Sequence, residues 1–182
     1  MILAARTITL KDGRLCVLRS PLPSDAENII RYLKTTAEET PFLNRYADEY
    51  TMTKEDAIRL IERLLAAPRD LLLLAEVDGE IAGASSFFSC SNKSRCAHRC
   101  TIGIAILRKF WDRGIGSAMM DCMLEKAAEY GYEQAELEVR ARNERAIALY
   151  RKKGFTAIGH LPHAVRHRDG TYDDDLMMIR LL

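Results

Sequence analysis

The sequence predicts a single α/β domain built on a mixed sheet of mostly antiparallel strands. Three pairs, Asp12-Gly13, Asp78-Gly79 and Asp169-Gly170, each lie between segments that can form strands, which is typical of tight hairpins. In the second half of the chain, strand and helix patterns alternate, which favours an α/β arrangement with some parallel pairing. The length of 182 residues suits one core, so we expect residues 1–182 to fold as one domain.

The individual elements follow from apolar spacing and from capping residues. Helices are predicted where apolar residues recur every three to four positions behind a capping residue, at about 24–35, after Thr53, from Gly114 to near Gly131, and after Asn143 up to Lys153. Strands are predicted where short apolar or alternating runs lie between turn residues, at 15–20, 71–77, 81–88, 100–107, 134–140, 155–161 and 172–181.

Charge and hydropathy argue against a nucleic-acid-binding protein and against a membrane protein. The net charge is +1, whereas a domain that binds nucleic acid is usually strongly basic, so we expect no nucleic-acid partner. No run of 18 apolar residues occurs, and the start of the chain does not resemble a secretory signal. We therefore expect no membrane partner and a cytoplasmic location.

The five cysteines match no standard metal or disulfide pattern. Cys90, Cys96 and Cys100, with His98 between the last two, are spaced unlike the ligands of known zinc sites, and no C-x-x-C pair occurs. An odd number with irregular spacing suits reduced thiols. We expect small buried side chains here and no metal site.

The segment Arg113-Gly114-Ile115-Gly116 has the character of an anion-binding turn. It follows an apolar strand and opens a long helix, whose first amides have no partners within the helix. Glycines let a phosphate approach the backbone closely, and Arg113 adds a cation. A Rossmann fingerprint requires a small residue where Met119 stands, and the Gly-Lys-Ser/Thr of a P-loop is absent. The pyrophosphate of coenzyme A is the remaining common ligand, and the alternative is a pair of glycines that serve helix packing only.

Around this turn, residues 98–156 resemble the core of the GNAT acetyltransferases. Residues 111–116 are similar to the R/Q-x-x-G-x-G/A loop of that family, with Trp111 at the usual Arg or Gln position, and residues 143–155 are similar to its N-x-x-A-x-x-x-Y-x-x-x-G-F pattern. The resemblance implies a single-domain GNAT fold with about six to seven strands flanked by about four helices. It also implies acetyl-CoA as cosubstrate.

The resemblance assigns roles to individual residues. It implies that Tyr150 is the catalytic acid that protonates the departing thiolate, and Tyr150 lies two helical turns beyond Asn143, so that both can face one cleft. Without the two motifs in register, Tyr150 would be interpreted as a packing residue. The implied cofactor contacts are the strand that pairs with the pantetheine arm, the pyrophosphate-binding amides and one side-chain amide: Ile104, Ala105, Ile106, Arg113, Gly114, Gly116, Ser117 and Asn143.

The acceptor side is less well defined. Residues 38–45 resemble the loop that shapes the acceptor pocket in small-molecule members, and residues 168–178 resemble their closing hairpin. The implied substrate contacts are Glu38, Glu39, Phe42, Arg45 and Asp174. Thr101 stands where many relatives carry a catalytic carboxylate, so the general base remains open among Glu38, Glu39, His98 and Asp174. The candidate cations for the 3′-phosphate of the cofactor are Lys109, Arg113, Lys152 and Lys153.

These residues favour an N-acetyltransferase in which a primary amine of a small molecule attacks the thioester directly. The oxyanion would be held by a main-chain N–H near Ile104. Two alternatives stay open, namely acetylation of a protein N-terminus or lysine, and a non-catalytic acyl-CoA-binding module. The resemblance also makes a homodimer through the C-terminal strands an expectation.

Overall fold

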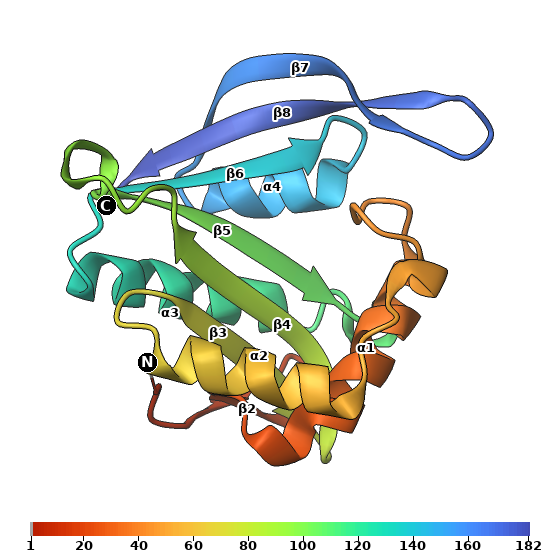
Figure 1. Ribbon diagram of the computed structural model, residues 1–182, viewed down its shortest axis with the longest axis vertical. Coiled ribbons are helices and arrows are strands. Elements are labelled where there is room, and N and C mark those ends of the chain that lie inside the picture. The colour runs from red at the N-terminus through yellow and green to blue at the C-terminus, as the bar shows by residue number, and fades with distance from the viewer. Residues whose placement is uncertain (1) are drawn as a thin grey trace.

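One eight-stranded sheet organises the protein, whose computed structural model describes residues 2–182 (Figure 1). The strand order is β1-β2-β3-β4-β5-β6-β8-β7, and every neighbouring pair is antiparallel except β5 and β6. The strands are β1 Arg6–Thr9, β2 Leu15–Arg19, β3 Leu71–Val77, β4 Glu80–Ser89, β5 Arg99–Ile106, β6 Gln134–Arg140, β7 Thr156–Arg166 and β8 Tyr172–Leu181. Seven of them match ranges expected from the sequence; the eighth is the short edge strand β1.

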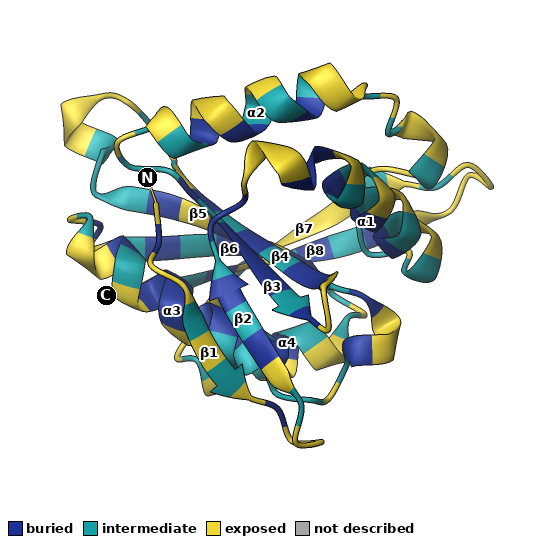
Figure 2. Ribbon diagram, turned by 90° about the horizontal axis from the view of Figure 1, so that it is seen from below, coloured by how far each residue is buried: buried dark blue, intermediate teal, exposed yellow. Residues whose placement is uncertain are grey.

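Two helices cover each face of the sheet (Figure 2). Helices α1 (Ala26–Glu39) and α2 (Lys54–Ala66) lie on one face, and α3 (Ile115–Glu129) and α4 (Glu144–Lys152) lie on the other. Four short 3-10 turns complete the described elements: Pro23–Asp25, Ala47–Glu49, Ser94–Cys96 and Arg108–Phe110. Within residues 2–182, no helix is both long enough and apolar enough to cross a membrane.

Local chemistry explains where these elements begin and turn. The Thr53 hydroxyl accepts the Asp56 N–H at 3.2 Å, and the Asp56 carboxylate accepts the Thr53 N–H at 2.9 Å, so α2 begins with a reciprocal capping box. Asp78 and Gly79 have φ of 52° and 77°, the left-handed values that a two-residue hairpin turn between β3 and β4 requires. Both features follow from the sequence pattern.

The core lies mainly between the sheet and α3. Met119, Met120 and Met123 are fully buried on this helix, and Phe87 of β4 is fully buried beside them in the same cluster. The unbranched methionine side chain fills irregular space, which suits a helix laid across a twisted sheet. This packing fixes the start of α3 against β5, where the cleft described below opens.

Strands β5 and β6 separate soon after they pair. Their parallel ladder joins only Arg99–Thr101 to Gln134–Glu136. Beyond it, β6 continues against β8 while β5 continues against β4, so the two strands diverge (Figure 1). The edge of β5 from Ile102 onward therefore has no strand partner on the β6 side among the described residues.

Candidate active site

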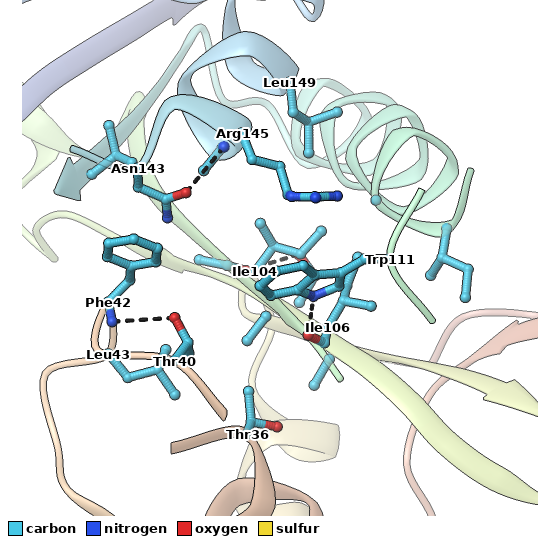
Figure 3. Close-up of a pocket in the computed structure, with 18 of the residues that line it drawn as sticks. Thr36, Thr40, Phe42, Leu43, Ile104, Ile106, Trp111, Asn143, Arg145 and Leu149 are labelled. Carbon is cyan, nitrogen blue, oxygen red and sulfur yellow. Dashed lines mark hydrogen bonds between the residues drawn. The ribbon is translucent and has the colours of Figure 1, made fainter. Parts of the chain in front are cut away.

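A cleft of about 680 Å³ occupies the gap between the diverging strands. In Figure 3, Thr36, Thr40, Phe42 and Leu43 lie on one side of β5, and Trp111, Asn143, Arg145 and Leu149 lie on the other. We call the second group the α3 side, which also includes Ile104, Ile106, Gly114, Gly116, Ser117 and Tyr150. The α1 side comprises Tyr32, Leu33, Thr36, Thr40, Phe42, Leu43, Asn44, Leu72, Glu138, Arg140 and Asp175.

The start of helix α3 presents main-chain amides to the cleft. Gly114 has φ of 98° and precedes the helix, and no described side chain caps the first turn. Gly114, Ile115, Gly116 and Ser117 line the cleft, so their N–H groups and the positive end of the helix dipole are available to an anion. These amides therefore face open space, as an anion-binding turn requires.

Gly116 also has a packing role. A Cβ atom at this position would lie 3.1 Å from Ile106 Cδ1 and 3.2 Å from Leu149 Cδ2. The missing side chain lets β5, α3 and α4 approach one another at the cleft. Gly116 therefore has the packing role that was the alternative interpretation, and this role is compatible with the expected phosphate cradle.

The edge of β5 is shaped by two side chains that bond to its backbone. The Tyr32 hydroxyl of α1 accepts the Ala84 N–H at 3.0 Å and donates to the Ala105 carbonyl at 2.8 Å, so it bridges β4 and β5 where a direct ladder bond would run. On the other side, Trp111 Nε1 donates to the Ile106 carbonyl at 2.7 Å (Figure 3). On the side away from β4, the edge of β5 at Ile104 has no strand partner among the described residues, lines the cleft and can bind an extended chain by strand addition.

Tyr150 lies in the cleft in an apolar setting. Its side chain is 6% exposed and its ring is 5.9 Å from that of Phe155. Burial raises the pKa of Tyr150 to about 12, since the phenolate is disfavoured away from water. Its hydroxyl makes no hydrogen bond to any described residue, so the proton is available to a ligand.

Asn143 joins Tyr150 in the cleft, as the helical spacing predicts. Its Oδ1 accepts the Ala146 N–H at 3.2 Å and caps α4 (Figure 3). The side-chain NH₂ makes no bond to another described residue and can donate to a ligand.

Arg113 does not line the cleft with its side chain. Its guanidinium pairs with Asp12 in the β1–β2 hairpin, and its Nε donates to the Lys109 carbonyl at 3.1 Å. Lys11 and Arg145 are the cations on this side of the cleft instead. Both lie far from the glycine turn in sequence, and no local pattern indicates them.

Arg145 and Trp111 form a cover across the α3 side (Figure 3). The Arg145 guanidinium lies 4.5 Å from the centre of the indole, a cation–π contact, and it also pairs with Asp112. This pairing lowers the pKa of Asp112. An arginine from the start of α4 therefore lies over Trp111, which stands at the Arg or Gln position of the family pattern.

A buried ion pair holds the α1 side together. Arg140 Nη1 lies 2.5 and 2.6 Å from the two Asp175 oxygens, and both residues are 4% exposed. Arg140 Nη2 donates to Asn44 Oδ1, which ties the loop after α1 to β6. These residues were not expected from the sequence, because the link depends on the register that places Arg140 opposite Asp175.

The acidic residue of β8 that reaches the cleft is Asp175, whereas Asp174 was expected there. Neighbouring strand residues point to opposite faces, and Asp174 instead accepts the His163 N–H at 2.8 Å and pairs with His160 at 3.1 Å. Asp174 therefore lies outside the cleft, in contact with β7.

Of the other expected acceptor contacts, only Phe42 lines the cleft. Glu39 accepts the Arg108 N–H at 2.6 Å, and thus joins the end of α1 to the turn after β5. Glu38 and Arg45 are exposed outside the cleft, with Arg45 over the ring of Tyr50. His98 precedes β5 at the end where β5 and β6 are still paired, so the structure leaves it away from the cleft as well.

Glu138 is the cleft carboxylate that sequence reasoning missed. It lies on β6 two residues before Arg140 and on the same face. Among residues 2–182, the carboxylates that line the cleft are Asp112, Glu138 and Asp175, and only Glu138 has no ion-pair partner. The alternation of charged residues at 136, 138 and 140 was the available signal for a charged face.

Four cations were expected near the 3′-phosphate, and Arg113 is one of them. Two of the other three also have carboxylate partners. Lys109 pairs with Glu80 at 2.6 Å, and Lys153 pairs with Asp121 at 2.5 Å. Lys152 is exposed and has no ion pair with a described residue. Within residues 2–182, no cluster of three or more His, Cys, Asp or Glu side chains is placed to hold a metal ion.

Comparisons with known proteins agree with this geometry. The model of the Acetyltransferase (GNAT) family matches residues 32–155. An N-alpha-acetyltransferase of Sulfurisphaera tokodaii is 31% identical over 109 residues, which are 54% of this chain and 64% of the relative. The L-amino acid N-acetyltransferase AaaT of Escherichia coli is 31% identical over 121 residues, which are 66% of this chain and 74% of the relative.

Solved structures share the whole fold. An acetyltransferase of the GNAT family from Streptococcus pneumoniae superposes with a TM-score of 0.87 at 26% identity and covers 92% of this chain and 99% of its own. The yncA protein of Salmonella typhimurium, solved with its cofactor acetyl-CoA, has a TM-score of 0.80 at 16% identity, covers 92% of this chain and 94% of its own, and shows the fold alone. With the amide cradle, the unpaired strand edge and the cleft tyrosine in place, the chain belongs to the GNAT family of acetyltransferases.

Proposed function

We propose that the protein transfers the acetyl group of acetyl-CoA to the primary amine of a small molecule. The observation that carries this proposal is the joint placement of three features in one cleft: the open amides of Gly114, Gly116 and Ser117, the free edge of β5 and the buried Tyr150. The amides suit the pyrophosphate, and the strand edge at Ile104, Ala105 and Ile106 suits the pantetheine arm. Lys11, which has no ion pair with a described residue, supplies positive charge beside them.

The chemistry follows from the two sides of the cleft. Glu138 takes a proton from the acceptor ammonium, directly or through water, so that the free amine attacks the thioester carbon. A main-chain N–H near Ile104 stabilises the oxyanion. As the carbon–sulfur bond breaks, Tyr150 gives its proton to the leaving thiolate. Tyr150 then takes up the second proton that the amine nitrogen loses as the amide forms. The products are the N-acetyl amine, coenzyme A as its thiol and one released proton.

The closed α1 side supports a small acceptor. The loop after α1 is joined to β6, to the turn after β6 and to the β7–β8 hairpin: Arg140 binds Asn44, the Arg142 guanidinium lies 5.7 Å from the centre of the Phe42 ring, and Arg168 pairs with Asp48 at 2.8 Å. A loop fixed to these elements narrows the entrance that a protein segment would need. The acetylation of a protein terminus therefore ranks behind a small amine.

The test is release of free thiol from acetyl-CoA in the presence of a panel of primary amines. We expect acceptor-dependent release and formation of the N-acetyl product by mass spectrometry, with acetyl-CoA binding confirmed by calorimetry. Acetyl-CoA binding without release for any amine would support the acyl-CoA-binding module instead. Release only with peptides would favour the protein acetyltransferase.

A further inference from the structure

The charged side chains that line the cleft nearly neutralise one another in pairs. Six such residues line it: Lys11, Asp112, Glu138, Arg140, Arg145 and Asp175. On the α3 side, Arg145 pairs with Asp112, and on the α1 side, Arg140 pairs with Asp175. Lys11 and Glu138 are left without an ion pair among the described residues.

The two unpaired charges belong to different sides of the cleft. The Lys11 N–H donates to the Arg113 carbonyl at 3.1 Å, and the Lys11 charge contributes to the lowered pKa of Asp112, so Lys11 lies beside the amide cradle. Glu138 shares its face of β6 with Arg140 on the α1 side. The negative charge therefore faces the acceptor, and the positive charge faces the phosphates of the cosubstrate.

No free cation accompanies Glu138 on the α1 side. Arg140 uses Nη1 for Asp175 and Nη2 for Asn44, and its Nε is buried without a partner and out of reach of a ligand. Outside the cleft, Arg142 pairs with Asp173 at 2.8 Å and Arg168 pairs with Asp48. The other described side chains that line the α1 side are uncharged, and four of them are apolar: Leu33, Phe42, Leu43 and Leu72.

We infer that the acceptor is a primary amine on an uncharged, apolar body, and that a carboxylate beside the amine disfavours a substrate. This inference rests on the proposed function and specifies the substrate class of the same site. An ammonium group held by Glu138 would bring an adjacent carboxylate close to a like charge. Asp175 already neutralises the Arg140 guanidinium, so Arg140 could offer its charge to that carboxylate only by giving up Asp175, which would leave a buried carboxylate unpaired.

A second positive charge is disfavoured for a related reason. A polyamine brings two or more ammonium groups, and only one unpaired carboxylate is available among the described residues of the cleft. The second ammonium would lie against uncharged side chains such as Leu33, Phe42 and Thr40, where no carboxylate compensates its charge. The site is therefore expected to select one amine and one apolar group.

The matched test compares 2-phenylethylamine with L-phenylalanine as acceptors. The two share the ring and the ethylamine chain and have amines of similar basicity, and they differ by the carboxylate. We expect kcat/KM to be at least about tenfold higher for 2-phenylethylamine. Equal or faster acetylation of L-phenylalanine overturns the inference alone, whereas no thiol release with either amine or with the wider panel, while acetyl-CoA binds, overturns the proposed function and the inference with it.

The variant Glu138→Gln tests the cause of the preference. It lowers turnover of both acceptors, because Glu138 also accepts the ammonium proton, so the readout is the ratio of the two kcat/KM values. We expect this ratio to fall severalfold, since the like charge that opposes L-phenylalanine is removed. The exposed Glu133 precedes β6 outside the cleft, and Glu133→Gln should leave the ratio unchanged. A ratio that is unchanged in Glu138→Gln overturns the role assigned to Glu138.

Discussion

The two sides of the cleft are built by different means. The α3 side acts mainly through main-chain groups: the amides at the start of α3, the edge of β5 and a helix-capping asparagine. The α1 side acts through side chains that come from α1, the loop after it, β6 and β8, and an arginine holds them together. Phosphates and an extended cofactor arm can be bound by backbone geometry, whereas recognition of an acceptor depends on side chains.

This difference predicts that substitutions on the two sides of the cleft should have different effects. Changes on the α3 side should act on acetyl-CoA binding or on the chemical step, and changes on the α1 side should act on the acceptor. The four predictions below test this separation, starting with the largest expected effect.

Tyr150→Phe should reduce kcat by about 100-fold or more, because removal of a positioned general acid removes a contribution of that order. The ring remains to fill its buried site, so acetyl-CoA affinity by calorimetry should stay within about twofold. Tyr130→Phe is the matched control, since Tyr130 packs against Phe87 outside the cleft at 5.7 Å. Unchanged turnover in Tyr150→Phe would remove this residue from the mechanism.

Arg140→Met should destabilise the protein by about 3–5 kcal/mol, because it leaves Asp175 buried without its partner. Adding Asp175→Leu should restore most of the stability in a denaturant titration, since an apolar pair of similar volume replaces the ion pair. The double variant still lacks the bond to Asn44, so we expect the acceptor KM to stay raised by about tenfold while acetyl-CoA affinity is normal.

The acceptor KM of this double variant distinguishes two roles of Arg140: positioning the loop for the acceptor, or stabilising the fold alone. If restored stability also restores the acceptor KM, Arg140 serves only the fold and the loop is held by its other contacts. Arg99→Met provides the control, because Arg99 pairs with Glu136 at the closed end of the same strand. Arg99→Met should change neither the acceptor KM nor the affinity for acetyl-CoA.

The contrast between the sides also explains what the sequence could predict. The glycine turn and the Asn143–Tyr150 spacing each lie within one loop or helix. Gly114 and Gly116 were found from a local pattern, Asn143 and Tyr150 were found from their resemblance to a family motif, and all four line the cleft. Seven strands and all four helices followed from the same local signals. Arg113 lies in the predicted turn, as expected. Its side chain, however, pairs with Asp12, and a partner so distant in sequence could not be predicted from the local pattern.

The α1 side could not be read in this way, because it depends on which strands are neighbours and in what register. The expected Asp174 and the observed Asp175 differ by one position, and in a strand one position changes the face. Glu39 and Arg45 belong to the expected loop, but the Arg108 amide and the Tyr50 ring engage them instead. Such contacts are set by tertiary packing, which no short pattern in one sequence contains.

Gly114→Ala should weaken acetyl-CoA binding by several-fold with a smaller effect on the acceptor KM. The residue has φ of 98°, and an added Cβ meets no atom within 4 Å, so backbone strain of about 1–2 kcal/mol is the only expected perturbation. Relief of that strain would turn the amides of the first α3 turn away from the pyrophosphate. Gly131→Ala, with φ of 76° and equally open space, carries similar strain beyond the other end of α3 and should leave binding unchanged.

The smallest expected effect concerns alkaline pH. Tyr150 donates a proton in its neutral form, which is present below its pKa of about 12, so kcat should not fall between about pH 7 and about pH 9.5. The raised pKa also means that Tyr150 begins to destabilise the folded state only above its ordinary pKa of about 10, outside that window. Any rise of kcat/KM in the window should follow the pKa of the acceptor amine and shift when the acceptor is changed. A fall of kcat near pH 9 that disappears in Tyr150→Phe would mean that the phenol is more hydrated than its burial indicates. The α3 side would then depend on a titrating side chain as well as on its backbone.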